Sequence, residues 1–147
     1  MIRKANIDDL SSIVALCTMF FNESKTGLTP VLSRSKAYDV IKEMIDSDMC
    51  ILHIAECKGS IVGMIGAIVS PHWFSDELVS QELFWYVLPE FRGLYGVELL
   101  KSMEERSKEL GASLISMVDL GERSPVDVLL KRNNYSIHEK TYIKRAS

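Results

Sequence analysis

One segment of the chain combines residue types that can hold an anionic ligand. Residues 85–100 read WYVLPEFRGLYGVELL: an apolar strand-like run stops at Pro89, Arg92 and two glycines follow, and a helical pattern then begins. The first turn of a helix exposes unpaired N–H groups and a partial positive charge, and glycines let a ligand approach the backbone. A guanidinium beside such a turn adds a fixed charge. The segment predicts a diphosphate site, although a purely structural strand-to-helix turn can carry the same residues.

The patterning of the rest of the chain predicts the elements that position this segment. Helical spacing of apolar residues predicts helices over 7–21, 35–47, 93–110 and 125–133. Short apolar runs between turn residues predict strands over 2–5, 50–57, 60–69, 79–88 and 112–118, with one or two closing strands within 135–143. The order strand, helix, strand over 79–118 implies a right-handed crossover between parallel strands.

Composition limits the class of protein. The 147 residues are 47% apolar and 25% charged, which fits one globular domain over 1–147, without a linker or an internal repeat. The net charge of −3 disfavours general nucleic-acid binding. No apolar run approaches the ~20 residues that a membrane span needs, and the N-terminal residues lack the apolar core of a signal peptide. We therefore expect a soluble protein without a nucleic-acid or membrane partner.

The cysteines indicate a reducing compartment. Cys17, Cys50 and Cys57 are odd in number and form no CxxC pair. We interpret all three as reduced structural residues, with neither a disulfide nor a metal site. A cytoplasmic location is the corresponding expectation.

Several local motifs, in the same order along the chain, resemble the GNAT superfamily of N-acetyltransferases. Residues 87–93, VLPEFRG, resemble the family's V-x-P-x-[YF]-R-G lead into its acetyl-CoA motif, and the leucines at 99–100 resemble the pair that follows. KELGA at 108–112 resembles the helix end before strand five, and LLKRNNY at 129–135 is similar to the late L-Y-x-x-x-G-F segment. The closing residues 136–145 resemble the last hairpin of the family.

The resemblance implies a fold and a co-substrate. The fold is an α/β domain with a mixed, mostly antiparallel sheet of six to seven strands, flanked by four helices, in which strands four and five splay apart. Acetyl-CoA would lie in that cleft. Its pantetheine chain would be lined by Trp85, Tyr86, Val87 and Leu88. Its diphosphate would be held by the backbone of Arg92, Gly93, Leu94, Tyr95, Gly96 and Val97.

The resemblance also implies how an acetyl group is transferred. An amine attacks the thioester directly, without an acyl-enzyme, so the protein must align the reactants, remove a proton and stabilise an oxyanion. Some family members carry a catalytic carboxylate on strand four, where Glu82 stands, although Gln81 lies equally close and a surface glutamate is the simpler interpretation. Strand alternation would place Glu82 on the same face as Phe84 and Tyr86.

Two positions depart from the family pattern. The anion loop is usually R/Q-x-x-G-x-G/A, whereas residues 92–97 read RGLYGV. Tyr95 then stands at the middle glycine, and Gly96 is expected to provide the close approach to the ligand. Many members carry a tyrosine in the late helix that protonates the leaving thiolate, whereas this chain has Leu130. Tyr86, Tyr95 or a water molecule would substitute for it.

These observations predict an acetyl-CoA-dependent N-acetyltransferase acting on a primary amine of a small molecule or protein. Trp73 and Phe74, in the loop before strand four, are candidates for contact with the acceptor. The resemblance also allows a homodimer, since dimers are frequent in the family. The main alternative is a non-catalytic module on the same fold that binds acyl-CoA or another protein. An unrelated α/β domain, in which the Arg92 turn only shapes the chain, is a further alternative.

Overall fold

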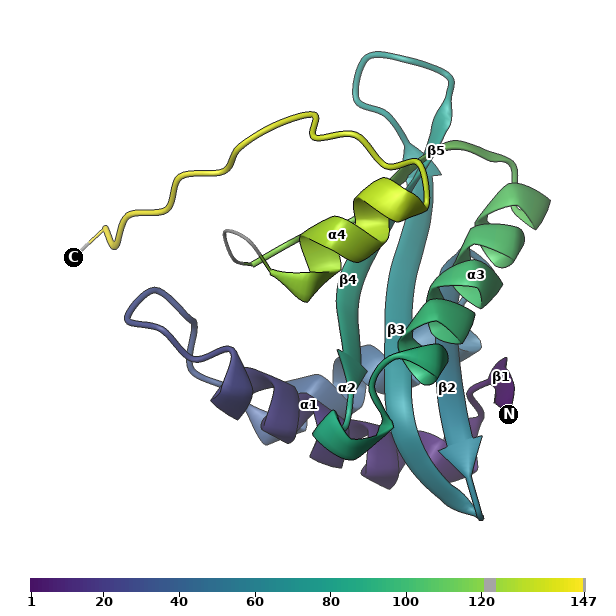
Figure 1. Ribbon diagram of the computed structural model, residues 1–147, viewed down its shortest axis with the longest axis vertical. Helices are drawn as coiled ribbons and strands as arrows, with labels where there is room; N and C mark the ends of the chain where they lie inside the picture. Colours follow the sequence, from purple (N-terminus) through teal and green to yellow (C-terminus); the bar gives the residue numbers. More distant parts are fainter. Residues whose placement is uncertain (121–123, 147) are drawn as a thin grey trace.

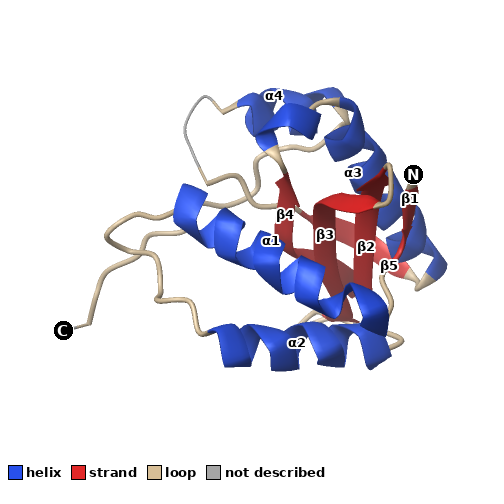
Figure 2. Cartoon of the chain, turned by 90° about the horizontal axis from the view of Figure 1, so that it is seen from below, coloured by secondary structure: helices blue, strands red, loops and turns tan. Residues whose placement is uncertain are grey.

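The computed structural model describes residues 1–120 and 124–146, which form a sheet between two layers of helices (Figures 1 and 2). The strands are β1 (Ile2–Lys4), β2 (Cys50–Cys57), β3 (Ser60–Pro71), β4 (Leu78–Val87) and β5 (Ala112–Ser116). The helices are α1 (Leu10–Glu23), α2 (Arg34–Asp46), α3 (Leu94–Glu109) and α4 (Pro125–Arg132). Short 3₁₀ turns, Ile7–Asp9 and Pro89–Phe91, precede α1 and α3.

The strands lie in the order β1-β2-β3-β4-β5, and every neighbouring pair is antiparallel except β4 and β5. Helix α3 links these two parallel strands, which confirms the crossover predicted from the sequence. Helices α1 and α2 cover one face of the sheet, and α3 and α4 cover the other (Figure 2).

Local signals in the sequence explain where the helices begin and end. Asn6 and Asp9 form a reciprocal capping box before α1, and Ser124 caps α4 by accepting from the backbone N–H of Asp127. Gly111, with a φ of 90°, follows the end of α3 in the left-handed conformation that glycine tolerates best. The predicted caps are therefore confirmed.

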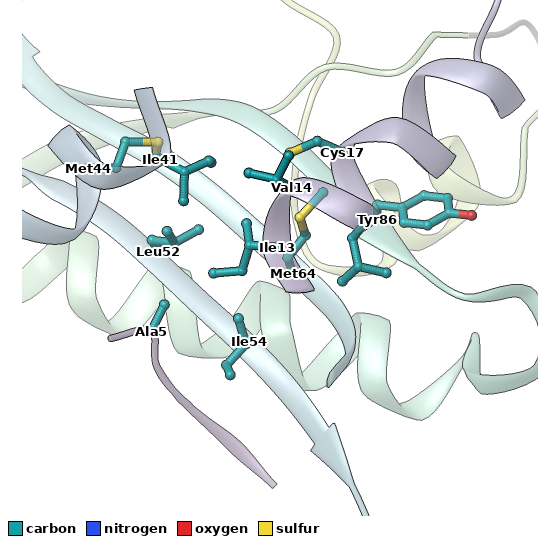
Figure 3. Packing of buried hydrophobic residues seen from close by; sticks show 11 residues of the cluster. Ala5, Ile13, Val14, Cys17, Ile41, Met44, Leu52, Ile54, Met64 and Tyr86 are labelled. Atoms are coloured by element: carbon teal, nitrogen blue, oxygen red, sulfur yellow. The ribbon is translucent and has the colours of Figure 1, made fainter. Parts of the chain in front are cut away.

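Each face of the sheet carries its own group of buried apolar side chains. The α1 cluster lies under α1 and α2 and brings together Ala5, Ile13, Val14, Leu16, Cys17, Ile41, Met44, Leu52, Ile54, Met64 and Tyr86 (Figure 3). The α3 cluster lies on the opposite face and consists of Ile51, Ala55, Val62, Ile65, Ala67, Val69, Val87, Leu99, Leu100, Met103 and Leu130. Membership of one cluster or the other therefore reports which face a strand residue occupies.

The end of the chain differs from the prediction. The sheet has five strands in the described residues rather than six or seven, and residues 136–146 contain no strand. They extend away from the sheet after Asn134, whose φ of 67° turns the chain (Figure 1). Residues with strand propensity, such as Tyr142 and Ile143, form a strand only where another strand offers hydrogen-bond partners. The prediction of closing strands was therefore wrong for this chain as it stands alone.

Among the described helices, none combines the length and apolar character that crossing a bilayer requires.

Candidate functional site

Strands β4 and β5 separate part of the way along β4. Their pairing begins at Leu78 and Ala112, and within the described residues it ends at Gln81 and Ser116. Strand β4 continues to Val87, still paired with β3 on its other side. The backbone groups of the second half of β4 that face away from β3 are therefore available to a ligand with amide groups of its own.

A β-bulge at this point changes which way the side chains of β4 point. Glu82 pairs with Ala67 and Phe84 with Gly66, so two positions of β4 advance against one of β3. Ala67 belongs to the α3 cluster, whereas Tyr86 belongs to the α1 cluster. Since cross-strand partners share a face, Glu82 lies on the face opposite to Phe84 and Tyr86. The alternation predicted from the sequence was therefore wrong across the bulge.

Glu82 is a buried carboxylate at the place where the two strands part. Its side chain is almost fully buried, and its Oε2 accepts a hydrogen bond from the backbone N–H of Val118 at 3.0 Å. Burial penalises the charged form and raises the pKa of Glu82 to about 7, and the bond from Val118 opposes this shift only in part. A carboxylate with this pKa can take up and release a proton near neutral pH.

Arg92 and Tyr86 meet at the end of α1 rather than at Glu82. Arg92 Nη2 donates to Glu23 Oε1 at 2.5 Å, and Arg92 Nε donates to the carbonyl of Val87 at 2.9 Å. The Tyr86 hydroxyl donates to Glu23 Oε2 at 2.9 Å, and the guanidinium lies 5.6 Å from the centre of the Tyr86 ring. The hydrogen bond from Arg92 lowers the pKa of Glu23, while burial and the bond to Glu23 raise the pKa of Tyr86.

This cluster contains a residue that sequence reasoning missed. Glu23 closes α1, and it holds Tyr86 and Arg92 although more than 60 residues separate it from either. No local motif marks Glu23, because its partners are set by the packing of α1 on the sheet. The Arg92 guanidinium consequently faces α1, and the anion-binding groups next to it are those of the backbone.

The start of α3 presents backbone N–H groups without a side-chain cap. Gly93 occupies the N-cap position with a φ of 97°, and no side chain there accepts a hydrogen bond from the first turn. A Cβ added at Gly93 would meet nothing within 4 Å. Leu94 is exposed on the first turn, and Tyr95 packs edge-on to Phe91. The geometry is that of an open helix N-terminus, which favours anions.

Gly96 has a different position from the one the sequence indicated. It is buried, and a Cβ added there would lie 3.7 Å from Cζ2 of the Trp85 ring. Gly96 therefore faces the sheet, and the glycine with open space around it is Gly93. Val97 follows in the same first turn, and its N–H donates to the carbonyl of Gly93.

The remaining predicted pantetheine residues lie along the second half of β4 and directly after it. Val87 belongs to the α3 cluster, while Leu88 packs against both clusters and donates its N–H to Val62 at 2.9 Å. The Trp85 ring packs in the α3 cluster, and its Nε1 is buried without a hydrogen-bond partner among the described residues. An orphaned buried donor is costly unless a ligand or water meets it.

The structure does not bring Trp73 and Phe74 close to the second half of β4 and the start of α3. Both are more than nine-tenths exposed in the loop before β4, whereas Arg92 follows the other end of that strand. At about 3.3 Å per residue, the 10 residues of β4 separate the two ends by about 30 Å.

A cavity among the described residues also lies away from this group. It measures about 580 Å³ and opens between α1 and the hairpin of β2 and β3, with Arg3, Asp9 and Glu56 on its walls. Arg3 forms ion pairs with both of these carboxylates. It contains neither Glu82 nor the start of α3.

Gly93 offers a direct test of the backbone conformation at the start of α3. We expect Gly93→Ala to lower the free energy of unfolding by about 1–3 kcal/mol, because alanine does not readily adopt the positive φ found there. Gly27→Ala is a matched control, since Gly27 also has open space but no positive φ, and it should change stability by less than about 0.5 kcal/mol. Urea denaturation measures both, and equal effects of the two variants would contradict the assigned conformation.

Comparison with known proteins identifies the class. The model of the acetyltransferase (GNAT) family matches residues 17–124. The chain therefore belongs to the GNAT acetyltransferase family, and its five-stranded mixed sheet with four helices is the family's fold. No curated protein sequence matches the chain.

Solved structures share this fold at low sequence identity. The chain resembles the aminoglycoside acetyltransferase AAC(6')-Iy bound to a CoA-containing bisubstrate analogue, with 16% identity, a TM-score of 0.82, and coverage of 100% of this chain and 97% of that one. It also resembles the ribosomal-protein-alanine N-acetyltransferase of Brucella melitensis, with 17% identity, a TM-score of 0.75, and coverage of 99% and 97%. A GNAT family acetyltransferase of Staphylococcus aureus shows 21% identity, a TM-score of 0.71, and coverage of 99% and 97%.

Proposed function

We propose that the protein transfers an acetyl group from acetyl-CoA to a primary amine. The observation that carries the proposal is the position of Glu82, a buried carboxylate with a pKa of about 7, at the point where β4 and β5 part. The family and two similar structures support it, since AAC(6')-Iy was solved with CoA and with a CoA-containing bisubstrate analogue.

The residues present fit acetyl-CoA at three places. The uncapped N–H groups after Gly93 suit the diphosphate, because they combine unpaired donors with the positive end of the helix dipole. Beyond Gln81, the side of β4 that faces away from β3 pairs with no described strand and suits the amides of the pantetheine chain. The buried Nε1 of Trp85 could donate a hydrogen bond to a carbonyl of the pantetheine chain. When bound, acetyl-CoA supplies the thioester.

The chemistry assigned to the protein is proton removal and alignment. A protonated amine is not a nucleophile, so Glu82 accepts its proton, directly or through one water molecule, in the gap between β4 and β5. The free amine then attacks the thioester carbonyl, a C–N bond forms and the C–S bond breaks. The nitrogen then gives up its second proton, which passes through water to the thiolate, and Glu82 releases the proton it accepted to the solvent. Backbone N–H groups of β4 that face the gap are placed to stabilise the oxyanion.

Tyr86 has a positioning role in this proposal. Its hydroxyl is bonded to Glu23 and lies on the other face of the strand from Glu82. To act as an acid toward the thiolate, the hydroxyl would have to leave Glu23. We therefore assign Tyr86, with Arg92, to holding the end of α1 against β4, which shapes the entrance to the gap.

Binding and turnover are tested separately. Acetyl-CoA is expected to raise the melting temperature, and release of free thiol should be detected with at least one member of a panel of small amines and N-terminal peptides. Desulfo-CoA, which lacks the reactive sulfur, is the control that should stabilise without releasing thiol. Absence of stabilisation at millimolar acetyl-CoA would contradict the proposed site. Stabilisation without thiol release from any amine would favour the non-catalytic acyl-CoA-binding module.

A further inference from the structure

An elongated cavity of about 580 Å³ lies between α1 and the sheet. Helix α1 crosses the strands, because its start lies beside Arg3 of β1 while its last residue, Glu23, bonds to Tyr86 of β4. The cavity follows the same course, from Arg3 and Glu56 at one end to Leu88 at the other. Its volume lies within the roughly 300–1,000 Å³ that is typical of small-molecule sites.

One end of the cavity has an excess of negative charge. Against the guanidinium of Arg3 stand three carboxylates, those of Asp8, Asp9 and Glu56. Arg3 is already engaged, because it donates to Asp9 at 2.8 and 2.9 Å and to Glu56 Oε2 at 3.0 Å. Within the described residues, the Asp8 carboxylate and Oε1 of Glu56 accept no hydrogen bond and pair with no cation. A cation that enters this end is therefore attracted.

The other end of the cavity is apolar. Ile61 continues the floor from Glu56, its cross-strand partner, and Leu88 follows directly after β4. Met19 belongs to the opposite wall, on α1, and is 48% exposed. At 1.5 Å per residue, the chain from Asp8 to Met19 separates the acidic end from the apolar end by about 16 Å. The cavity therefore suits a ligand that is charged at one end and apolar at the other.

We propose that this cavity binds a small organic cation with a short apolar chain, of the alkylammonium type. The cationic head lies against Asp8 and Glu56, and the apolar chain extends along α1 toward Met19 and Leu88. An anion of the same shape is disfavoured, because the N–H groups of Arg3 are occupied and the uncompensated charges are negative. The N-terminal ammonium of the chain does not take this place, since it donates to the backbone carbonyl of Glu56 rather than to its carboxylate.

The cavity is separate from the site assigned to acetyl transfer. Arg3 pairs with Ile54, a member of the α1 cluster, so the acidic end of the cavity lies on the α1 face of the sheet. Glu82 lies on the opposite face, where its partner Ala67 belongs to the α3 cluster. A cation in this cavity is therefore a ligand in addition to the acetyl acceptor, and the inference does not depend on the proposed function.

NMR of the methionine methyl groups locates the ligand. Hexyltrimethylammonium is the probe, because it has the required charge and chain but no N–H bond and therefore cannot be acetylated. With isotope-labelled methionine, the Met19 signal is expected to shift saturably, while the signals of Met44 and Met103, which are buried elsewhere, stay in place. Hexanoate, with a similar chain and the opposite charge, should produce a clearly smaller shift. An equal or stronger response to hexanoate, or no saturable shift of Met19 with the cation, would overturn the proposal.

Substitutions at the two ends of the cavity test the assignment by calorimetry. Asp8→Lys is expected to weaken hexyltrimethylammonium binding by about 5–30-fold, because it replaces an attraction with a repulsion. Met19→Ala removes apolar contact at the other end and should weaken binding by about 3–10-fold. Asp39→Lys, the same charge change on α2 outside the cavity, is the control and should alter the affinity by less than about 2-fold.

All three substituted residues are exposed, so the circular dichroism spectrum should not change. Equal effects of Asp8→Lys and Asp39→Lys would show that the cation responds only to the overall charge of the protein, and this result would also overturn the proposal. An unchanged affinity in Met19→Ala would do the same, because the apolar chain would then lie elsewhere.

Discussion

Replacing Glu82 with glutamine is expected to lower kcat by about 10²–10⁴-fold while leaving acetyl-CoA affinity nearly unchanged. The amide keeps the size of the side chain and its acceptor oxygen for the N–H of Val118, which lies 3.0 Å away, but it cannot take up a proton. For the unmodified protein, kcat/KM should rise with pH through about 7 and then level off, since the carboxylate form is the active base. The variant should lack this step in its pH profile.

The same substitution should increase stability above neutral pH. The pKa of Glu82 is about 7 in the folded protein against 4.5 in the unfolded chain, so the folded state binds the proton more tightly. Its stabilising contribution is therefore complete below pH 4.5 and is lost as the pH rises through 7. The loss is on the order of 3 kcal/mol. Urea denaturation at pH 4 and pH 8 measures the free energy of unfolding of both proteins. The difference between Glu82→Gln and the unmodified protein should be more favourable to the variant at pH 8 than at pH 4.

Gln81→Ala is the matched control for both measurements. Gln81 is the neighbouring residue and is exposed. It forms the last residue pair between β4 and β5, with Ser116, and this pairing involves the backbone rather than the side chain. It should retain most of the rate and show no change in the pH dependence of stability. A Glu82→Gln variant with an intact rate across the pH range would remove Glu82 from the mechanism, and a loss of rate in Gln81→Ala instead would move the base to the neighbouring position.

Adding a methyl group at Gly66 is expected to destabilise the protein by about 1–3 kcal/mol or more. A Cβ at this position would lie 2.3 Å from Cζ of Phe84 and less than 3 Å from two further ring atoms, because the ring lies across the glycine. The ring cannot move freely, since it packs against the α1 cluster. Urea denaturation of Gly66→Ala measures the cost directly.

A double-mutant cycle shows whether the clash is the cause. Phe84→Leu removes the ring atoms nearest to Gly66, so the combination Gly66→Ala/Phe84→Leu should cost clearly less than the two single changes added together. Strictly additive effects would show that the loss at Gly66 comes from the backbone instead. We also expect Gly66→Ala to impair catalysis, because Gly66 borders the bulge that orients Glu82.

Features that depend on neighbouring residues in the chain were predictable from the sequence. The caps at Asn6 and Ser124, the turn after α3 at Gly111 and the segment from Pro89 into α3 all follow from residue types at fixed spacing. These signals act over a few residues, so no knowledge of the packing is needed. The same local signals, with the family resemblance, were sufficient to give the order of the elements up to α4.

Features that depend on distant residues were not predictable in this way. Alternation failed at Glu82 because the register shift is set between β3 and β4, where Phe84 covers Gly66. Glu23 was missed because its contacts with Tyr86 and Arg92 exist only after α1 packs on the sheet. The closing strands predicted within 135–143 are absent from the structure, because strand propensity does not reveal whether a partner strand is within reach.

The bulge in β4 also limits which changes of length this strand can accept. Along a regular strand, gaining or losing one residue turns every later side chain to the opposite surface. In β4 the extra residue between Glu82 and Phe84 already causes one such change of face. The carboxylate of Glu82 and the ring of Phe84 therefore point to opposite faces of the sheet. Removing Leu83 would remove the bulge and restore regular alternation along β4. Either Glu82 or Phe84 would then point to the wrong face of the sheet. Viable length variants of this strand should therefore compensate with a second change nearby, or lie outside 80–87.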